Sequence, residues 1–260
     1  YKRQAAGYQG LVFDPDHGCS ALANDTTSPL RTATHILLSA PPGRGGDPVL
    51  RFHRQELTNV PNLKWIGYLS TIAVYGNHDG NSIDENTPTK PTSQRAKRRE
   101  ATEQEWISLA RHIGCRINVF RIAGIYGPGR SALSQLKRGQ ARRIIKDGHV
   151  SNRVHVADIA QVVLKTIDGA GSSIVYNVSD DEPAPPQDVM GFAADLLGLQ
   201  LPPAIAFQDA EMTELARSFY ADLRRVRNDR LKKELGVQLQ YSTFREGLRA
   251  IIADENKKNA

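Results

Sequence analysis

The sequence predicts an α/β fold with a doubly wound parallel sheet and helices on both faces of that sheet. Short apolar runs recur along the chain between turn residues, which is typical of parallel strands that are buried on both sides. Segments with apolar residues at helical spacing lie between these runs. The two patterns alternate up to about residue 125, and this alternation favours right-handed crossovers within one sheet.

Five segments are expected to be strands, because each is short, rich in apolar and β-branched residues, and bounded by turn or polar residues. They are Leu11–Phe13, His35–Ala40, Lys64–Ser70, Cys115–Ile122 and Ser173–Val178.

Four segments are expected to be helices, because their apolar residues recur on one helix face. They are Pro48–Leu57, Ser93–Ile113, Ala157–Ile167 and Gln187–Leu197. The last is followed by Gly198, a residue type that favours a helix end. Beyond residue 125 helices dominate, so we expect a smaller second lobe there.

Composition excludes several classes of protein. The chain has 260 residues, of which 40% are hydrophobic and 24% charged, as in ordinary globular proteins. It has neither the roughly 18 consecutive apolar residues of a transmembrane helix nor the apolar region of a signal peptide at its start. The two cysteines are too few for a disulfide framework, and the seven histidines show no paired metal-binding spacing. We expect free thiols in a reducing cytoplasm, no membrane partner and no metal site.

The formal net charge of +6 suits an anionic ligand such as a nucleotide. The basic clusters of the sequence are Arg95, Lys97, Arg98 and Arg99, and then Lys137, Arg138, Arg142, Arg143 and Lys146. Aromatic residues are not interleaved with them, so a stacking platform for single-stranded nucleic acid is lacking. We expect no nucleic-acid partner, and RNA binding is the weakest alternative. The second cluster is either solvated surface or a holder of a substrate diphosphate.

Polar and glycine-rich motifs follow the expected strands in a definite order. Hydroxyl groups lie where the third expected strand ends, which is where open α/β sheets place their ligands. The motifs are Ser70-Thr71-Ile72-Ala73-Val74-Tyr75-Gly76, Asp84-Glu85-Asn86-Thr87-Pro88, Arg121-Ile122-Ala123-Gly124-Ile125-Tyr126-Gly127-Pro128-Gly129, His155-Val156-Ala157-Asp158-Ile159-Ala160, Tyr176-Asn177-Val178 and a final Glu234-Leu235-Gly236.

Together these motifs resemble the extended short-chain dehydrogenase/reductase superfamily, the group of nucleotide-sugar epimerases and dehydratases. The resemblance runs from about residue 10 to about residue 250. Within the superfamily the sequence is most similar to the atypical NAD(P)-dependent epimerase/dehydratase-like branch that includes the bacterial YeeZ-type proteins.

The resemblance implies a Rossmann-type sheet over residues 1–125 that binds NAD or NADP. Residues 126–260 are then mainly a lobe on the substrate side, with elements that return to the sheet. The family opens with a strand and a G-x-x-G-x-x-G turn that seats the cofactor pyrophosphate on a helix N-terminus. No such turn precedes Leu11, and Leu11–Asp14 resembles the third strand of the family. We therefore expect the first βαβ unit to be missing from this sequence, with a reduced fold as the alternative.

The resemblance also implies catalytic positions. The family uses a Tyr-x-x-x-Lys pair, in which Tyr exchanges a proton with the substrate oxygen and Lys lowers the pKa of the phenol and holds the nicotinamide ribose. Alignment on Glu103 places Arg95 at the Tyr position and Arg99 at the Lys position. Arginine is not an acid or base near neutral pH, so Arg99 is expected to bind ribose or phosphate. Thr71 matches the residue that polarises the substrate oxygen, and Tyr75 or water is the candidate proton donor.

The resemblance implies that the remaining predicted site residues contact the cofactor. Asp14 matches the acid that contacts adenine. The turn after the second expected strand matches the segment that lies along the cofactor, with a plain strand-to-helix turn as the alternative. Small residues after the fourth strand allow the nicotinamide to approach closely, with tight packing as the alternative. The predicted cofactor-binding residues are Asp14, Ser39, Ala40, Pro41, Pro42, Thr71, Arg99, Ala123 and Gly124.

Structural roles stay open for three of the residues considered. The Thr71 hydroxyl can instead satisfy a backbone group at the strand end. Tyr75 can instead pack in the core, and we favour that role. His155 either faces the substrate or is a satisfied structural histidine, and we favour the second.

We expect hydride transfer at a hydroxyl or carbonyl carbon of a small or nucleotide-linked (sugar) substrate. The alternative is a catalytically inactive NAD(P)-binding regulatory or scaffold protein, because the Tyr-x-x-x-Lys pair is lost. The resemblance further implies a cytoplasmic protein and a homodimer through the helix expected at Ser93–Ile113.

Overall fold

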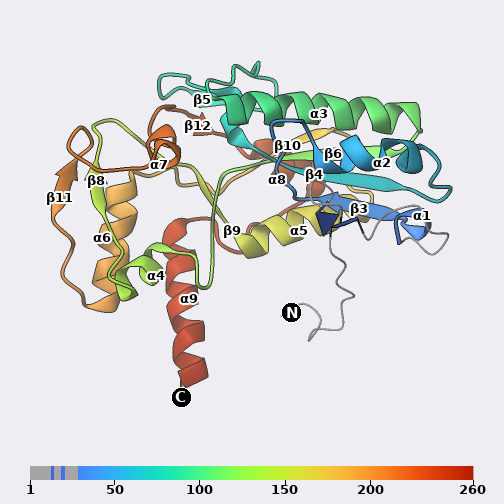
Figure 1. Cartoon of the computed structure of the whole chain (residues 1–260). Helices are drawn as coiled ribbons and strands as arrows, with labels where there is room; N and C mark the ends of the chain where they lie inside the picture. Colours follow the sequence, from blue (N-terminus) through green and yellow to red (C-terminus); the bar gives the residue numbers. More distant parts are fainter. Residues whose placement is uncertain (1–12, 15–18, 21–28, 260) are drawn as a thin grey trace.

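A computed structural model describes residues 13–14, 19–20 and 29–259. Its central sheet has four parallel strands in the order β10-β6-β4-β3, as Figure 1 shows. These strands are β3 (His35–Leu38), β4 (Trp65–Thr71), β6 (Arg116–Ile122) and β10 (Val175–Val178). Four of the five expected strands are therefore confirmed, together with their parallel pairing.

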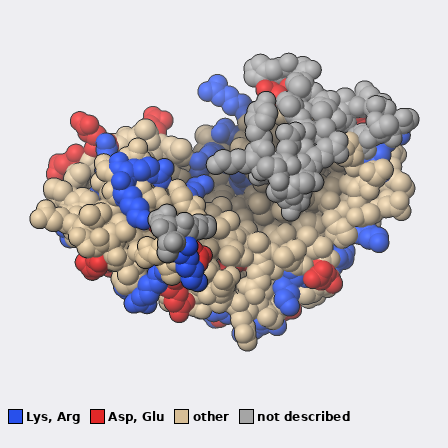
Figure 2. Space-filling model, turned by 90° about the horizontal axis from the view of Figure 1, so that it is seen from below, with Lys and Arg blue, Asp and Glu red and all other residues tan. Residues whose placement is uncertain are grey.

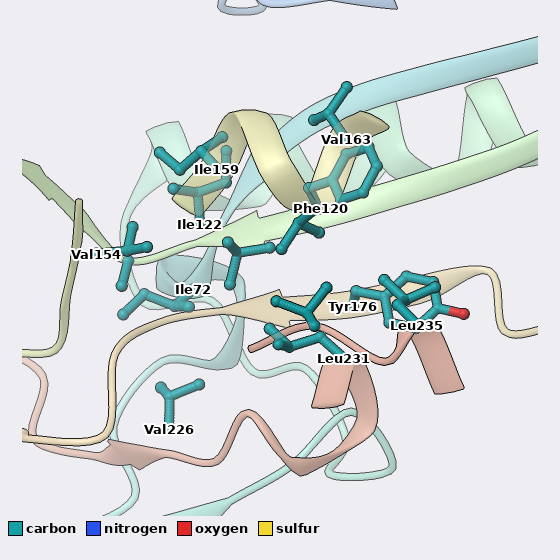
Figure 3. Close-up of a cluster of buried hydrophobic side chains, with 14 of the residues drawn as sticks. Ile72, Phe120, Ile122, Val154, Ile159, Val163, Tyr176, Val226, Leu231 and Leu235 are labelled. Atoms are coloured by element: carbon teal, nitrogen blue, oxygen red, sulfur yellow. The ribbon is translucent and has the colours of Figure 1, made fainter. Parts of the chain in front are cut away.

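Helices cover both faces of the sheet, because successive side chains of a strand point to opposite faces. On one face, α2 (Pro48–Thr58) and α3 (Gln94–His112) pack on Ile66 and Val119. On the other face, α5 (Val156–Ile167) and α8 (Asp229–Leu235) pack on a second cluster. Figure 3 shows this cluster, which includes Phe120, Ile122, Ile159, Val163, Tyr176, Leu231 and Leu235. The doubly wound architecture is thus confirmed.

A smaller lobe lies beside the sheet (Figure 1). Its core joins α4 (Ala132–Lys137), α6 (Pro186–Leu197) and α9 (Phe244–Asn259). Its strands are β8 (Arg143–Ile145) and β11 (Ala204–Ala206), which pair in parallel. Two further parallel pairs lie outside the central sheet, β7 (Gly124–Tyr126) with β9 (Arg153–His155), and β5 (Ser82–Ile83) with β12 (Arg225–Val226). The short helices are α1 (Pro29–Thr32), η3 (Ile72–Tyr75) and α7 (Glu214–Ser218).

The first expected strand is corrected by the structure. Leu11 and Val12 lie outside the described residues. Phe13–Asp14 forms β1, which pairs antiparallel with β2 (Cys19–Ser20) in a separate two-stranded sheet. Only four residues separate β1 from β2 in the sequence, and a parallel neighbour would need a crossover of about a dozen or more.

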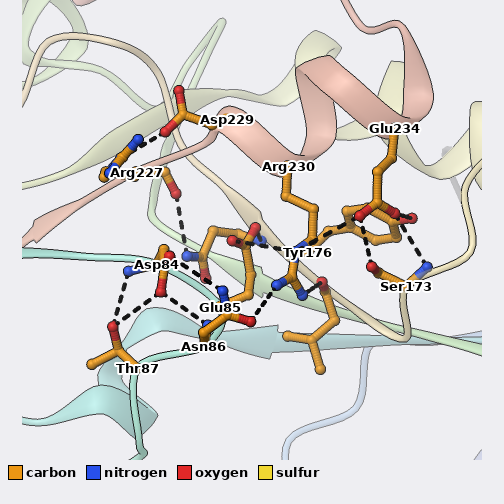
Figure 4. Close-up of polar contacts among 12 residues, drawn as sticks. Asp84, Glu85, Asn86, Thr87, Ser173, Tyr176, Arg227, Asp229, Arg230 and Glu234 are labelled. Atoms are coloured by element: carbon orange, nitrogen blue, oxygen red, sulfur yellow. Dashed lines mark hydrogen bonds and ion pairs between the residues drawn. The ribbon is translucent and has the colours of Figure 1, made fainter.

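The last sequence motif forms a structural joint between α8 and the sheet, drawn in Figure 4. Glu234 accepts hydrogen bonds from the Ser173 hydroxyl at 2.8 Å and the Tyr176 hydroxyl at 2.9 Å. Arg230 lies 3.7 Å from Glu85 in the polar loop after β5 and donates to Asn86 at 2.7 Å. The polar loop and the final motif therefore hold α8 against β10, a role that needs no ligand.

Asp47 is a strong helix cap whose loss is expected to destabilise the protein. Its carboxylate accepts from the amides of Val49 at 2.9 Å and Leu50 at 3.0 Å, at the start of α2. We expect Asp47→Ala to lower the free energy of unfolding by about 1–2 kcal/mol. Urea denaturation measures this loss. Thr213→Ala at the exposed cap of α7 is the control, and an equal loss in both variants would contradict the role of Asp47.

The described part of the chain contains no helix that is both long enough and apolar enough to cross a membrane.

Candidate functional site

The carboxyl ends of the central strands bring several predicted site residues to one edge of the sheet. Thr71 is the last residue of β4 and pairs in register with Ile122, the last residue of β6. Ala123 and Gly124 follow directly, and Ser39 follows β3. Ser39 and Gly124 are exposed. Parallel sheets bind ligands at this edge, so the residues lie where a cofactor would be held.

The hydroxyl of Thr71 caps η3 and is still able to donate. Its Oγ1 accepts a hydrogen bond from the amide of Ala73 at 3.2 Å, and the side chain is half-buried. A hydroxyl carries one proton beside its acceptor lone pairs, so the cap leaves that proton for a ligand oxygen. The structural and functional roles predicted for Thr71 are compatible.

Arg99 clamps α3 to β4. Its Nη1 donates to the Tyr68 hydroxyl and to the Leu69 carbonyl, both at 3.1 Å. Burial raises the pKa of Tyr68 to about 12, although the charge of Arg99 acts in the opposite direction. The predicted bond to a cofactor ribose stays a prediction, and it would have to use the other guanidinium nitrogens.

Arg95 lies one helical turn before Arg99 and has a different environment. Its guanidinium carbon is 5.5 Å from the centre of the Phe219 ring, which comes from the second lobe. Both side chains are exposed, Phe219 to 61%. The two arginines that the resemblance places at the Tyr and Lys positions are therefore not equivalent, because Arg99 is bonded to β4 whereas Arg95 faces solvent.

Tyr75 is placed in the core. Its side chain is fully buried, and its hydroxyl donates to Asn177 Oδ1 at 2.7 Å. The guanidinium of Arg121 stacks on its ring at 4.7 Å, and burial raises the pKa of the phenol. This environment favours the packing role over that of proton donor, because the hydroxyl is engaged away from the open edge.

A buried ion pair, which the sequence motifs do not indicate, joins Arg121 of β6 to Glu103 of α3. Arg121 donates to Glu103 at 2.8 Å through Nη2 and at 3.2 Å through Nε, and Glu103 also accepts from the Ser70 hydroxyl. Glu103 is fully buried. Burial opposes the charge of Arg121, but the bonds to Glu103 raise its pKa above the ordinary value. One feature of the sequence could have indicated this pair, because Glu103 is an acidic residue on the apolar face of the helix expected at Ser93–Ile113.

The turn after β3 leads into α2, whose first residues are capped by Asp47. Pro42 is buried while Ser39 and Pro41 are exposed and Ala40 is half-buried. The N-terminus of α2 that follows is occupied by the Asp47 carboxylate, so it is not available to a phosphate. Contact of this turn with a cofactor stays a prediction. Asp14 is exposed in β1 and lies outside the four-stranded sheet, so its predicted adenine contact is not supported by strand position.

His155 has a structural role in this molecule. Its Nδ1 accepts from the amide of Ala157 at 3.2 Å at the start of α5, and its ring lies between those of Tyr126 and Tyr241. Burial lowers its pKa. In the same motif, Asp158 accepts from the amides of Gln240 and Tyr241 and so holds the chain before α9.

The second basic cluster does not act as one unit. Lys137 pairs with Glu255, and Arg138 donates to backbone carbonyls of its own lobe. Arg142 and Lys146 donate to the carbonyls of Glu211 and Tyr220, which flank α7. Figure 2 shows Lys and Arg side chains at the margin of a hollow between the lobes.

Asp180 is a buried carboxyl whose ionisation is expected to cost stability. It is 2% exposed and accepts from the amide of Glu182 at 3.3 Å. Burial raises its pKa from 3.8 to about 8, while that amide and the charge of Arg153 act in the opposite direction. A raised carboxyl pKa means that stability falls as the pH rises from 3.8 towards 8.

We therefore expect Asp180→Asn to be more stable than the parent at pH 8, by about 1–2 kcal/mol more than at pH 5. Chemical denaturation at a series of pH values measures the difference. The exposed Asp195→Asn is the control and should show no such dependence. A difference for Asp180→Asn that does not change with pH would contradict the assignment.

Across residues 13–14, 19–20 and 29–259, no group of three or more His, Cys, Asp and Glu side chains is arranged to hold a metal ion.

Comparisons with known proteins found a family model, a curated relative and several solved structures to which the chain is similar. Residues 56–179 match the model of the NAD dependent epimerase/dehydratase family. A solved structure of a functionally unknown conserved protein from Silicibacter pomeroyi is 46% identical, with a TM-score of 0.86 over 96% of this chain and 85% of that chain. Protein YeeZ of Escherichia coli K12 is 26% identical over 89% of this chain and 79% of that protein. The UDP-glucose 4-epimerase of Thermotoga maritima, solved with UDP-glucose, is 18% identical, with a TM-score of 0.68 over 87% of this chain and 78% of that chain.

Proposed function

We propose that the protein belongs to the NAD dependent epimerase/dehydratase family, whose model matches residues 56–179, and that it binds NAD or NADP and catalyses hydride transfer. The reacting group is a hydroxyl or carbonyl of a small or nucleotide-linked substrate. When bound, the nicotinamide supplies or takes up the hydride. In the reducing direction the carbonyl carbon would gain that hydride and the carbonyl oxygen would gain a proton from water, with one hydride used per carbonyl.

The observation that carries the proposal is the position of Thr71. A hydroxyl with a proton to donate ends the strand beside β6, and the small Ala123 and Gly124 follow β6 at the same edge. Such residues fit a flat nicotinamide ring at that edge. The hydroxyl would stabilise the negative charge that develops on the substrate oxygen, and the positive charge of Arg95 would add to this effect.

Proton supply is the step in which this protein would differ from its family. Arginine holds its protons near neutral pH, and Tyr75 is buried against Asn177. Water at the open edge is the remaining donor. The loss of the pair also favours the second candidate, a protein that binds the cofactor without turnover.

Calorimetric titration of NADH and NADPH into protein expressed from the full reading frame tests the proposal. We expect binding of at least one of them, followed by oxidation of the bound cofactor with some member of a panel of carbonyl compounds. Absence of binding at millimolar cofactor would reject the proposal. Binding without turnover across the panel would favour the non-catalytic candidate.

Two further expectations concern the whole molecule. A cytoplasmic location and a homodimer through α3 follow from the family resemblance. The exposed face of α3 is polar and includes Lys97, Gln104 and Arg111. Sedimentation analysis measures the oligomeric state.

A further inference from the structure

Arg95 lies level with Thr71 at the carboxyl edge of the sheet. Because α3 connects the end of β4 to the start of the parallel strand β6, it runs antiparallel to β4. Arg99 sets the register, since it donates to the carbonyl of Leu69. Arg95 is one turn, about 6 Å, nearer to the start of α3. Thr71 is two residues, about 7 Å, nearer to the end of β4.

Arg95 has no acidic partner among the residues that the structure describes, where no carboxylate lies within 4.0 Å of its guanidinium. The acids of neighbouring segments are already engaged. Glu103 pairs with Arg121, and Asp222 pairs with Arg224 at 3.2 Å. Glu100 accepts from the Thr89 hydroxyl. The edge beside Thr71 therefore carries an uncompensated positive charge.

Phe219 supports the guanidinium of Arg95 without using its donors. An arginine that lies over an aromatic face keeps its N–H groups in its own plane, where they are directed to the side. That planar fork matches the two oxygens of a carboxylate. The contact with Phe219 thus orients the guanidinium of Arg95 and leaves its N–H groups available to a planar anion.

Beyond Phe219 the second lobe has a largely apolar pocket. Its cavity volume is about 730 Å³, and Phe219 is part of its wall. The other walls include Ile144, Met212, Ala216 and Tyr220, with Arg142 and Glu211 at the polar part. This pocket suits the hydrocarbon part of a ligand whose charged end is at Arg95.

We propose that the substrate is a carbonyl acid, with its carboxylate on Arg95, its carbonyl at Thr71 and an apolar side chain that passes Phe219 into the pocket. This inference rests on the proposed hydride transfer, and it names the substrate class for that site. The carboxylate takes the place beside the reacting carbon where the family has its phenol. Arg95 is then a residue for substrate recognition, whereas Arg99 holds α3 on β4.

The test compares two ligands that differ in the carboxylate. α-Ketoisocaproate and methyl isobutyl ketone share the carbonyl and the branched chain, and calorimetry measures their binding to the full-length protein with and without NADPH. We expect the parent to prefer the acid. Arg95→Gln should reduce this preference by about 10-fold to 100-fold, the effect of losing a charge-assisted pair, without changing binding of the ketone.

Lys97→Gln removes an exposed charge two residues further along the same helix and should keep the preference. Arg95→Lys, which keeps the charge but loses the fork, should fall between the two. Equal binding of acid and ketone by the parent would overturn the inference, as would an Arg95→Gln variant that binds the acid as the parent does. Dihydroxyacetone phosphate is the third ligand. If it binds more tightly than the acid, and Arg95→Gln removes this binding, the carboxylate assignment is overturned.

Oxidation of NADPH in the same mixtures separates this inference from the proposed function. If the parent and Arg95→Gln reduce the acid equally well, and no better than the neutral ketone, hydride transfer stands and the substrate class is wrong. If the acid binds through Arg95 but no panel member is reduced, the anion site stands and hydride transfer is wrong.

Discussion

Replacing Arg121 by Met is expected to lower the free energy of unfolding by about 3–5 kcal/mol. The change leaves the carboxylate of Glu103 buried without its cation, where it is fully shielded from water. It also removes the guanidinium that stacks on Tyr75. Because these residues join α3, β4 and β6, the loss should appear in the global unfolding transition, measured by urea denaturation with tryptophan fluorescence.

The exposed pair of Arg54 and Glu105 supplies the matched control. Its side chains are 47% and 45% exposed, so Arg54→Met should cost no more than about 1 kcal/mol. The double variant Glu103→Met with Arg121→Met should recover much of the loss, because two apolar side chains need no partner. A cost for Arg121→Met as small as that of Arg54→Met would show that the buried pair is not a main support of this edge.

Replacing Thr71 by Val is expected to lower kcat for cofactor-dependent reduction by about 100-fold. Val has nearly the shape of Thr but no hydroxyl, so the substrate oxygen loses its donor in the transition state. The measurement is the rate of NADPH oxidation with the best carbonyl substrate of the panel. Affinity for the cofactor, measured by calorimetry, should change little.

Thr71→Ser is the matched control, since it keeps the hydroxyl and the cap on the amide of Ala73. It should retain kcat within a few-fold. The thermal midpoint of each variant separates a structural effect from a catalytic one, because the lost cap costs only about 1 kcal/mol. If Val and Ser lower the rate equally, the hydroxyl is not the group that polarises the substrate.

Much of the scaffold was predictable because it depends on local periodicity. The expected strand Cys115–Ile122 and helix Ser93–Ile113 agree with β6 and α3 to within one residue at each end. Gly198 has the left-handed conformation expected at a helix end, with a φ of 63°. The prediction for the first strand was wrong because Phe13–Asp14 pairs with Cys19–Ser20, and an apolar run does not indicate which segment a strand pairs with.

The candidate site was predictable only in part. Motif order located Thr71, Arg95 and Arg99, but it did not distinguish the two arginines. Arg99 donates through Nη1 to the Leu69 carbonyl, whereas Arg95 lies on a ring from the second lobe. The sequence around Tyr75 is compatible with a proton donor or a packed side chain, and its burial in the structure favours packing.

The sequence by itself determined the alternation of strands and helices, the caps and the position of a hydroxyl at a strand end. These features depend on neighbours within a few residues, whose spacing is set by backbone geometry. The tertiary structure decided which polar groups remain for a ligand. The partner of Tyr75 is 102 residues away and that of Arg121 is 18 away, so only the packed chain shows that both are engaged and that Arg95 is left facing solvent.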